Sequence, residues 1–508
     1  MRRTSRSLAS AAPAALLLAA MLAGGAAVAQ ERAITIVLPE EPDIIDPCHA
    51  SRSNIGRVVK QNVAETLTEI DPADGSVEPR LATSWEQVDD RTWRFELKEG
   101  VKFHDGTPFD AEAAVFSINR TLDPQLDCEI RVKFFGNTKI TAKAVDANTL
   151  EVQSDGPAPI MPTMMGTMTM VSPNTVTDRL TREPVGTGPY VFTSWRPGQD
   201  VVLTRFEDYW GEQPEVEKAT YIWRSESAVR AAMVATGEAD IAPSISVQDA
   251  TDPDMDFSYF DSETTNFRID VDIPPLDDVR IRKALNLAID RESIRGSILS
   301  EDVVAATQFV VPSINGYNPD LKPWPYDPDQ ARQLIEEAKG DGVPVDREIV
   351  IFGRRGIHAG VTEKLEVIHS MLQDVGLNVT LRLVEVAEWV DLYTKPFAED
   401  RPANLVHAMH DNNNGDAVFT VFFKYHTEGA QSALSDPRVD EVIEKATVAT
   451  NPERQKLWQE AFRLINEEIV ADVPLFHMVG YTRVGNKVNF TPSISTNSEI
   501  QIATVTFK

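Results

Sequence analysis

The chain has 508 residues, of which 42% are hydrophobic and 25% charged, and its formal net charge is −29. This composition is ordinary for a folded protein, and the length suits two or three domains. The acid excess argues against nucleic acids and anionic membranes as partners, since both require a basic surface, so we expect no nucleic-acid partner.

The first 29 residues have the pattern of a secretory signal peptide. Arg2, Arg3 and Arg6 form a positively charged start, residues 11–29 carry no charge, and residues 27–29 (AVA) form a small-x-small cleavage site. The alternative is an uncleaved membrane anchor, although the segment is rich in Ala and Gly and therefore weakly apolar. We predict cleavage and a periplasmic location.

Two cysteines, Cys48 and Cys128, are the only ones in the sequence. In an exported chain, two cysteines fit one disulfide bond formed in an oxidising compartment. Two buried free thiols are the alternative.

The first half of the chain predicts short strands and two helices. Between residues 92 and 98, polar residues alternate with Trp93, Phe95 and Leu97, which is the pattern of a half-buried strand. Gly237 is expected to end the second helix. The predicted strands are 33–38, 92–98, 190–192 and 201–203, and the predicted helices are 109–120 and 228–236.

The second half carries stronger helix signals. Capping residues precede amphipathic stretches, and Pro often follows the cap. The expected caps are Asp277 or Asp278, Asp327, Thr362, Asp436 and Asn451. Strands are expected at 349–352, 379–383 and 473–476, so the order of strand and helix predicts a parallel α/β unit. Because no flexible linker separates the halves, we expect lobes joined by a hinge.

Signatures of catalysis are missing from the sequence. It has no Gly-x-Ser-x-Gly, no His-Glu-x-x-His and no Gly-rich loop followed by Lys-Ser or Lys-Thr. A cysteine nucleophile would need a free thiol of low pKa. We therefore expect that the protein is not an enzyme and needs no cofactor. The alternative is that it is a secreted hydrolase.

A series of short motifs resembles the extracellular solute-binding proteins of family 5, which include dipeptide-, oligopeptide-, glutathione- and nickel-binding proteins of ABC importers. The motifs follow the order of that family. They are residues 45–47 (IDP), 62–67 (NVAETL), 79–85 (PRLATSW), 97–109 (LKEGVKFHDGTPF), 186–190 (GTGPY), 209–211 (YWG), 237–241 (GEADI), 278–286 (DVRIRKALN) and 289–291 (IDR).

The resemblance implies a two-lobed α/β fold of the periplasmic-binding-protein type, with an extra subdomain on the first lobe. The ligand would be enclosed between the lobes by hinge closure. The partner would be an ABC permease and its ATPase in the inner membrane, served by a monomer. The implied parts are a signal peptide at 1–29, lobe I at 30–60, its extra subdomain at 61–184, lobe I again at 185–268, lobe II at 269–479 and a C-terminal return to lobe I at 480–508.

The resemblance also implies ligand-binding residues in the second lobe. In the peptide-binding members, a Trp and a later Asp line the pocket, and the Asp takes the ammonium group of the ligand. Trp389 and Asp411 match these positions, and Asn412, Asn413 and Asp416 share the loop of Asp411. The chain departs from the pattern at Ala408, where the peptide binders carry a second Trp. The alternative role of Asp411 is to cap a loop by hydrogen bonding to its backbone.

Five methionines lie close together at positions 161, 164, 165, 168 and 170. They are interpreted as core filler, as an adaptable pocket wall or as a soft-metal site. We include Met168 and Met170 among the candidate ligand contacts. The predicted function is a receptor for a peptide or peptide-like solute. The alternative is a metal-chelate receptor of the nickel type, to which His407 and His410 could contribute. Trp85, Trp210 and His104 are expected to be structural.

Overall fold

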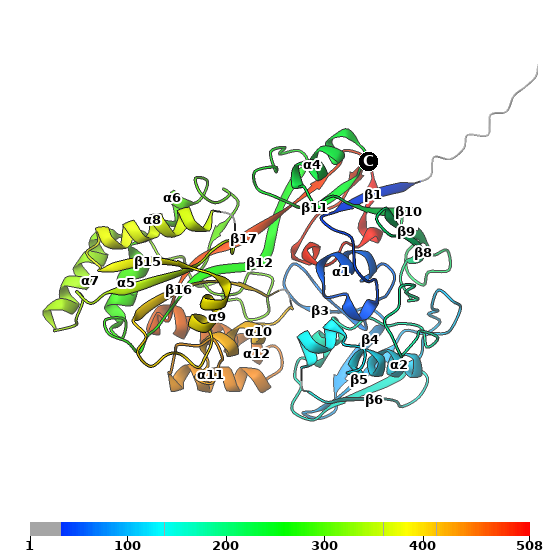
Figure 1. Cartoon of the computed structure of the whole chain (residues 1–508). Helices are drawn as coiled ribbons and strands as arrows, with labels where there is room; N and C mark the ends of the chain where they lie inside the picture. Colours follow the sequence, from blue (N-terminus) through cyan, green and yellow to red (C-terminus); the bar gives the residue numbers. More distant parts are fainter. Residues whose placement is uncertain (1–31, 137, 359, 413) are drawn as a thin grey trace, which may run out of the picture.

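Two lobes joined by long strands make up the protein (Figure 1). This computed structural model describes residues 32–508 except 137, 359 and 413, so the predicted signal peptide and Asn413 lie outside the described residues. Within those residues, no helix is long and apolar enough to cross a lipid bilayer.

One mixed sheet runs through both lobes. Its strand order is β15-β14-β16-β12-β17-β11-β1-β10-β9-β8, and β13 pairs with β17 beside it. The strands are β1 (Ala33–Leu38), β8 (Tyr190–Arg196), β9 (Asp200–Arg205), β10 (Lys218–Trp223), β11 (Ile241–Ile245), β12 (Asp256–Ile269), β13 (Val304–Ala305), β14 (Ile349–Arg354), β15 (Val379–Val384), β16 (Ala403–Asp411) and β17 (Asp472–Val484).

The antiparallel strands β12 and β17 form the connection between the lobes. Their first-lobe pairing runs from Asp256 opposite Arg483 to Phe260 opposite Val479, and the register then shifts before Thr264 pairs with His477. From Glu263 to Ile269, β12 also pairs with β16 of the second lobe. The crossing therefore lies at residues 260–264, earlier in the chain than the predicted boundary at 269.

The hinge contains a strained residue. Ser262 lies in the irregular stretch of β12 and has a φ of 71°, in the left-handed region that side chains other than Gly rarely adopt. Backbone strain of this kind costs about 1–3 kcal/mol and gathers at functional sites. The strain marks the part of β12 that faces the space between the lobes.

The first lobe carries an additional subdomain, seen at the lower right of Figure 1. Its antiparallel sheet has the order β4-β5-β7-β6 and packs against α2 (Ala111–Leu122). As the alternation predicted, Trp93, Phe95 and Leu97 are buried. The strands are β4 (Ala82–Gln87), β5 (Thr92–Leu97), β6 (Ile140–Ala144) and β7 (Thr149–Ser154), and nearby lie β2 (Thr68–Ile70), β3 (Val77–Pro79) and α3 (Met161–Met165).

The second lobe contains the predicted parallel unit. Strand β14 pairs in parallel with β15 and β16, and α8 (Val361–Asp374) connects β14 to β15. The other long helices of this lobe are α5 (Val279–Leu287), α7 (Pro328–Gly340), α9 (Val386–Tyr393), α10 (Val418–Tyr425), α11 (Pro437–Val448) and α12 (Glu453–Arg463).

Most predicted helix caps are confirmed. The side chains of Asp278, Asp327 and Asp436 each accept a backbone N–H at the start of α5, α7 and α11. Two predicted caps are wrong. Gly360, with a φ of 74°, takes the N-cap position of α8 and leaves Thr362 inside the helix; α12 begins after Pro452, so Asn451 does not cap it.

Several of the motifs meet in the core of the first lobe around Glu65, which is fully buried. Its carboxylate accepts hydrogen bonds from Arg80 Nε at 2.8 Å, Tyr209 OH at 2.9 Å, Trp210 Nε1 at 2.8 Å and Thr187 Oγ1 at 2.9 Å. Hydrogen bonds from three of the motifs, residues 79–85, 186–190 and 209–211, therefore meet at the carboxylate of Glu65. The motifs to which these residues belong thus have a structural role.

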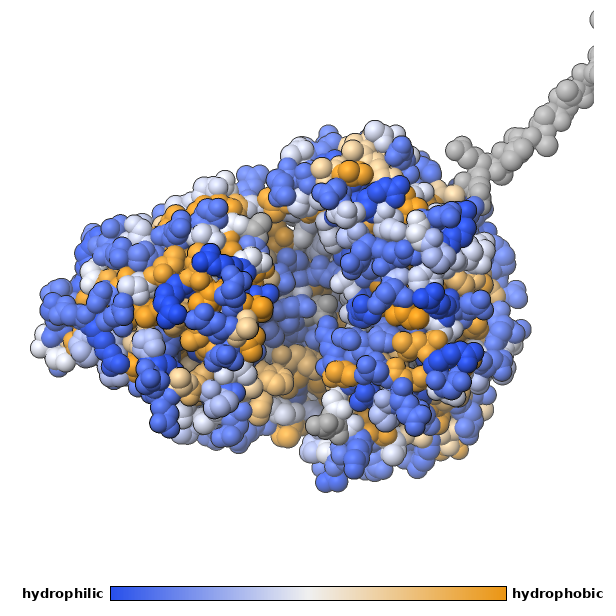
Figure 2. Space-filling view, in the orientation of Figure 1, coloured by the Kyte–Doolittle hydropathy of each residue, from blue (hydrophilic) through white to orange (hydrophobic). Residues whose placement is uncertain are grey.

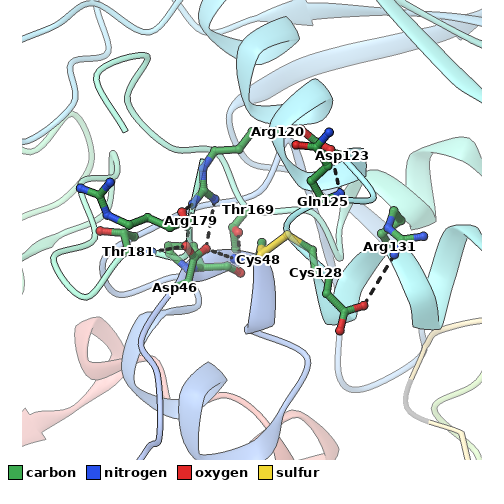
Figure 3. The surroundings of a disulfide bond; sticks show 12 residues. Asp46, Cys48, Arg120, Asp123, Gln125, Cys128, Arg131, Thr169, Arg179 and Thr181 are labelled. Carbon is green, nitrogen blue, oxygen red and sulfur yellow. Dashed lines mark hydrogen bonds and ion pairs between the residues drawn. A yellow bond between two sulfur atoms is a disulfide. The ribbon is translucent and has the colours of Figure 1, made fainter. Parts of the chain in front are cut away.

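A second buried ion pair lies beside the predicted disulfide bond, which is confirmed (Figure 3). The Cα atoms of Cys48 and Cys128 are 5.3 Å apart. Next to the bond, Arg120 NH2 donates to Asp46 Oδ2 at 2.6 Å, and the backbone N–H of Thr181 donates to the same oxygen at 2.7 Å. The disulfide bond and this ion pair join the N-terminal segment to the extra subdomain.

Candidate functional site

A cavity of about 510 Å³ lies between the lobes at the hinge. Figure 2 shows that the molecular surface is hollowed between the two lobes. The cavity is lined by Pro39, Glu40, Ser51, Ser53, Asn54, Arg57, Lys133, Ser244, Asp261, Ser262, Glu263, Asp411, Asn497 and Ser498. A ligand bound here would contact both lobes and the strand between them.

Separate elements bring these side chains together. Helix α1 (Ser53–Val59) supplies Asn54 and Arg57, the end of β16 supplies Asp411, and the C-terminal return supplies Asn497. Ser244 at the end of β11, like Ser262, has a positive φ, of 56°. Two strained residues therefore line one cavity, which supports a functional role for it.

Three carboxylates crowd the hinge side of the cavity: Asp261, Glu263 and Asp411. Burial raises the pKa of Asp261 to about 7, with a further contribution from Asp411. Burial also raises the pKa of Glu263 to about 8, again helped by the neighbouring carboxylates. In the free protein, no nearby cation among the described residues offsets the burial and mutual repulsion of these carboxylates. A bound cation would supply the missing positive charge.

The two cationic residues of the cavity do not neutralise this cluster. Arg57 is 3% exposed, and it donates to Thr496 O at 2.9 Å, Asn54 Oδ1 at 3.1 Å and Ser244 Oγ at 2.9 Å. Burial lowers its pKa to about 10. Lys133 is exposed. Together with Glu40, the lining therefore holds four carboxylates against two cations, which favours a positively charged ligand.

Asp411 is the predicted ligand residue that lies on the cavity wall. It ends β16, is exposed, and accepts a hydrogen bond from Ser262 Oγ across the hinge. Its neighbour Asn412 is 1% exposed and donates to Asp416 O at 3.1 Å and Thr420 Oγ1 at 2.8 Å. Asn412 thus fixes the loop behind Asp411 and does not line the cavity.

Trp389 and Asp416 lie away from the cavity. The indole of Trp389 donates to His407 O at 2.9 Å and stacks on Tyr393 with ring centroids 4.6 Å apart. Asp416 is 2% exposed, and its two oxygens accept from Arg454 Nε at 2.7 Å and NH2 at 2.8 Å. The side chains of Trp389 and Asp416 are therefore engaged by partners within the second lobe, and neither lines the cavity.

Met168 and Met170 are fully buried in the hydrophobic core of the first lobe. This placement corresponds to the core-filler interpretation of the methionine segment, and neither side chain lines the cavity. The backbone N–H of Met170 donates to Glu65 O at 2.7 Å. Their position gives no support to a ligand contact.

His407 is buried, His410 is half-buried, and both have partners in the second lobe. His407 Nε2 lies 3.0 Å from Lys364 Nζ, and His410 Nε2 lies 2.8 Å from Thr420 Oγ1. Burial lowers the pKa of both imidazoles well below the usual value. In the part of the chain that the structure describes, no group of three His, Cys, Asp or Glu residues is arranged to hold a metal ion.

Sequence reasoning missed Asp261, Glu263 and Arg57. A weak signal for the first two exists, because two acids two residues apart within a strand are expected on one face. The polar residues around them, Ser262 and Thr264 to Asn266, gave no contrast that would single them out. Arg57 had no local signal, since its partners Ser244 and Thr496 lie far along the chain.

Residues 76–429 match the family described as bacterial extracellular solute-binding proteins, family 5 Middle. Among curated proteins, the probable di/tripeptide-binding protein 5 of Pseudomonas aeruginosa (strain UCBPP-PA14) is 27% identical over 92% of this chain and 94% of its own length. The glutathione-binding protein GsiB of Shigella flexneri is 28% identical over 76% of this chain and 78% of its own length.

Solved structures share the two-lobed fold. The nickel ABC transporter protein from Bacillus halodurans matches with a TM-score of 0.80 and 23% identity, over 94% of this chain and all of that chain. HbpA2 from Haemophilus parasuis matches with a TM-score of 0.82 and 21% identity, with the same coverage. At these identities the matches establish the architecture.

Proposed function

Because the chain belongs to the bacterial extracellular solute-binding proteins of family 5, we propose that it captures a peptide or peptide-like solute bearing an ammonium group and delivers it to an ABC importer. The observation that carries the proposal is the acidic cavity at the hinge, where Asp261, Glu263 and Asp411 gather. The similarity to relatives named for di/tripeptides and glutathione supports the choice of solute class.

Capture would proceed by closure of the lobes about β12 and β17. In the free protein, water reaches the cavity, and burial keeps the carboxyl groups of Asp261 and Glu263 partly protonated near neutral pH. As the lobes close over an ammonium group, water leaves and the effective dielectric constant falls, which strengthens each charge contact. Asp411 from the second lobe and the hinge carboxylates would then hold the same cation, so ligand binding stabilises the closed form.

Export and delivery follow from the same proposal. We place the mature protein in the periplasm after removal of residues 1–29, where it acts as a monomer. It would release the solute to a permease and ATPase complex in the inner membrane. The protein itself would perform no covalent chemistry.

Affinity for an ammonium ligand is expected to rise by about tenfold between about pH 5.5 and 7.5, a range below the usual peptide-amine pKa of about 7.7–8.0. The carboxyl groups of Asp261 and Glu263, with pKa values of about 7 and 8, are largely neutral at the lower pH. They ionise as pH rises, so each step toward neutral pH adds negative charge facing the cation. Isothermal titration calorimetry with Ala-Ala at several pH values measures the effect.

The matched control is the double variant Asp261→Asn, Glu263→Gln, which keeps the shape of the cavity and removes both titrations. Its affinity is expected to be lower and nearly independent of pH over the same range. An affinity of the native protein that is flat or falls with rising pH would contradict the assignment of these carboxylates.

The proposed function is tested by mass spectrometry of the purified protein, first under native conditions and then after denaturation. The expected result is a released organic solute that carries a basic amino group. Release of a metal chelate, or of an anion without an amino group, would contradict the proposal.

A further inference from the structure

The extra subdomain of the first lobe touches the second lobe at two places. At the first, the ring of Phe134 meets the ring of Phe419 edge to face, with centroids 6.4 Å apart and planes at 80°. At the second, the turn that contains Gly75 lies against the backbone of Ser313 and Gly415. In Figure 1, the part of the second lobe that carries α10 faces this subdomain. Both contacts therefore join the lobes outside the connecting strands β12 and β17.

Phe134 is held firmly by the first lobe. It belongs to the turn Arg131–Phe135, whose last residue is 3% exposed and packs in the hydrophobic core of that lobe. The backbone N–H of Val132 donates to Cys128 O at 3.2 Å, which ties the turn to the disulfide bond. Lys133 of the same turn lines the cavity at the hinge. The ring of Phe134 is thus presented to the second lobe beside the wall of the cavity.

Phe419 is presented from the second lobe by the first turn of α10. Its helix neighbours Val418 and Phe422 pack against the hydrophobic core of that lobe, whereas Phe419 is not among the described residues that do so. Asp416 accepts the backbone N–H of Val418 at 2.9 Å and thereby fixes the start of the helix. The ring of Phe419 is nevertheless half-buried. Contact with Phe134 accounts for part of that burial.

The second contact depends on a glycine. Gly75 has a φ of 74° and is buried, although residues 72–74 beside it are exposed. A Cβ atom at this position would lie 2.5 Å from Ser313 O and 3.1 Å from Gly415 O. The facing surface is held in place, because the backbone N–H of Asn315 donates to Gly415 O at 3.0 Å. Glycine therefore permits an approach between the lobes that a larger residue would prevent.

We propose that the two contacts form an interlobe clasp, which favours the closed arrangement of the lobes and thereby strengthens binding of the solute. A solute that binds the closed arrangement binds more tightly when that arrangement is already populated. The effect on affinity rests on the proposed function, whereas the effect on the lobes can be measured without any solute. The clasp consists of Phe134, Phe419, Gly75, Ser313 and Gly415.

Calorimetric titration of the full mature protein with Ala-Ala tests the glycine contact. In Gly75→Ala the added methyl group meets Ser313 O, so this variant is expected to bind at least about fivefold more weakly than the native protein. Gly100→Ala is the matched control. Gly100 lies in the same subdomain with a φ of 75°, and no other described part of the chain comes within 4 Å of its Cβ position. Equal affinities of the two variants would overturn the clasp.

A double-mutant cycle tests the aromatic contact. Phe134→Leu and Phe419→Leu are each expected to weaken binding of Ala-Ala by about 2- to 12-fold, the range for the loss of one aromatic pair. The double variant should bind no more weakly than the single variants, because either substitution removes the same contact. Phe423→Leu, at an exposed position of α10, should leave the affinity unchanged. Losses that multiply in the double variant would show that the two rings act separately and would overturn the clasp.

Small-angle X-ray scattering of the solute-free proteins separates failure of the clasp from failure of the proposed function. Gly75→Ala is expected to have a larger radius of gyration than Gly100→Ala and the native protein, because its lobes stand further apart. Equal radii of all three proteins would overturn the clasp, whatever they bind. If the radii differ as expected and no dipeptide binds, the clasp stands and the proposed solute class is overturned.

Discussion

Replacing Glu65 by alanine is expected to destabilise the first lobe by about 3–5 kcal/mol, the cost of removing one partner of a buried ion pair. Glu65 is fully buried, and its carboxylate accepts four side-chain hydrogen bonds. Its removal would leave Arg80 without its closest carboxylate and would leave the indole N–H of Trp210 unpaired. Urea denaturation followed by tryptophan fluorescence and circular dichroism measures the change in the free energy of unfolding.

Glu78→Ala is the control for this substitution, because Glu78 is exposed on β3 in the same lobe. Its effect should stay within about 0.5 kcal/mol, as for most surface changes. If Glu65→Ala were no more destabilising than Glu78→Ala, the motif residues around Glu65 would not have the structural role assigned to them.

Asp411→Asn is expected to weaken binding of an ammonium-bearing dipeptide by about 10- to 100-fold, because it removes one charge-assisted hydrogen bond of about 1.5–3 kcal/mol. Asp411 is exposed at the end of β16, so the fold should tolerate the change. Asparagine keeps an oxygen that accepts from Ser262 Oγ while removing the charge. Calorimetry with Ala-Ala measures the loss.

The control for Asp411→Asn is Asp400→Asn, which removes an exposed charge elsewhere in the second lobe. Its affinity for Ala-Ala should equal that of the native protein. Equal affinities of both variants and the native protein would remove Asp411 from the ligand site.

The fold could be predicted where local physics is strong. Asp327 and Asp436, each followed by Pro, start helices as expected, since a capping carboxylate and a residue with fixed φ act within a few positions. The prediction that Thr362 caps α8 was wrong, although Thr is a common N-cap residue. The deciding residue was Gly360, whose left-handed backbone turns the chain into α8 two positions earlier.

The site could be predicted only in part, because long-range contacts decide which side chains are free. Asp411 and Asp416 are the same residue type in one loop, and no local pattern separates them. Arg454, 38 positions further on, pairs with Asp416 and leaves Asp411 at the cavity. Trp389 was likewise matched by position, whereas its packing on Tyr393 places it inside the second lobe.

The central claim is that the hinge cavity holds the ammonium group of a peptide-like solute, and calorimetric comparison of Ala-Ala with N-acetyl-Ala-Ala tests it most directly. The two probes share a peptide backbone and C-terminus, and acetylation removes the positive charge. Ala-Ala is predicted to bind at least about tenfold more tightly, because only its amine can pair with the carboxylates of the cavity. An acetylated peptide that binds as tightly as Ala-Ala, or more tightly, would contradict the account.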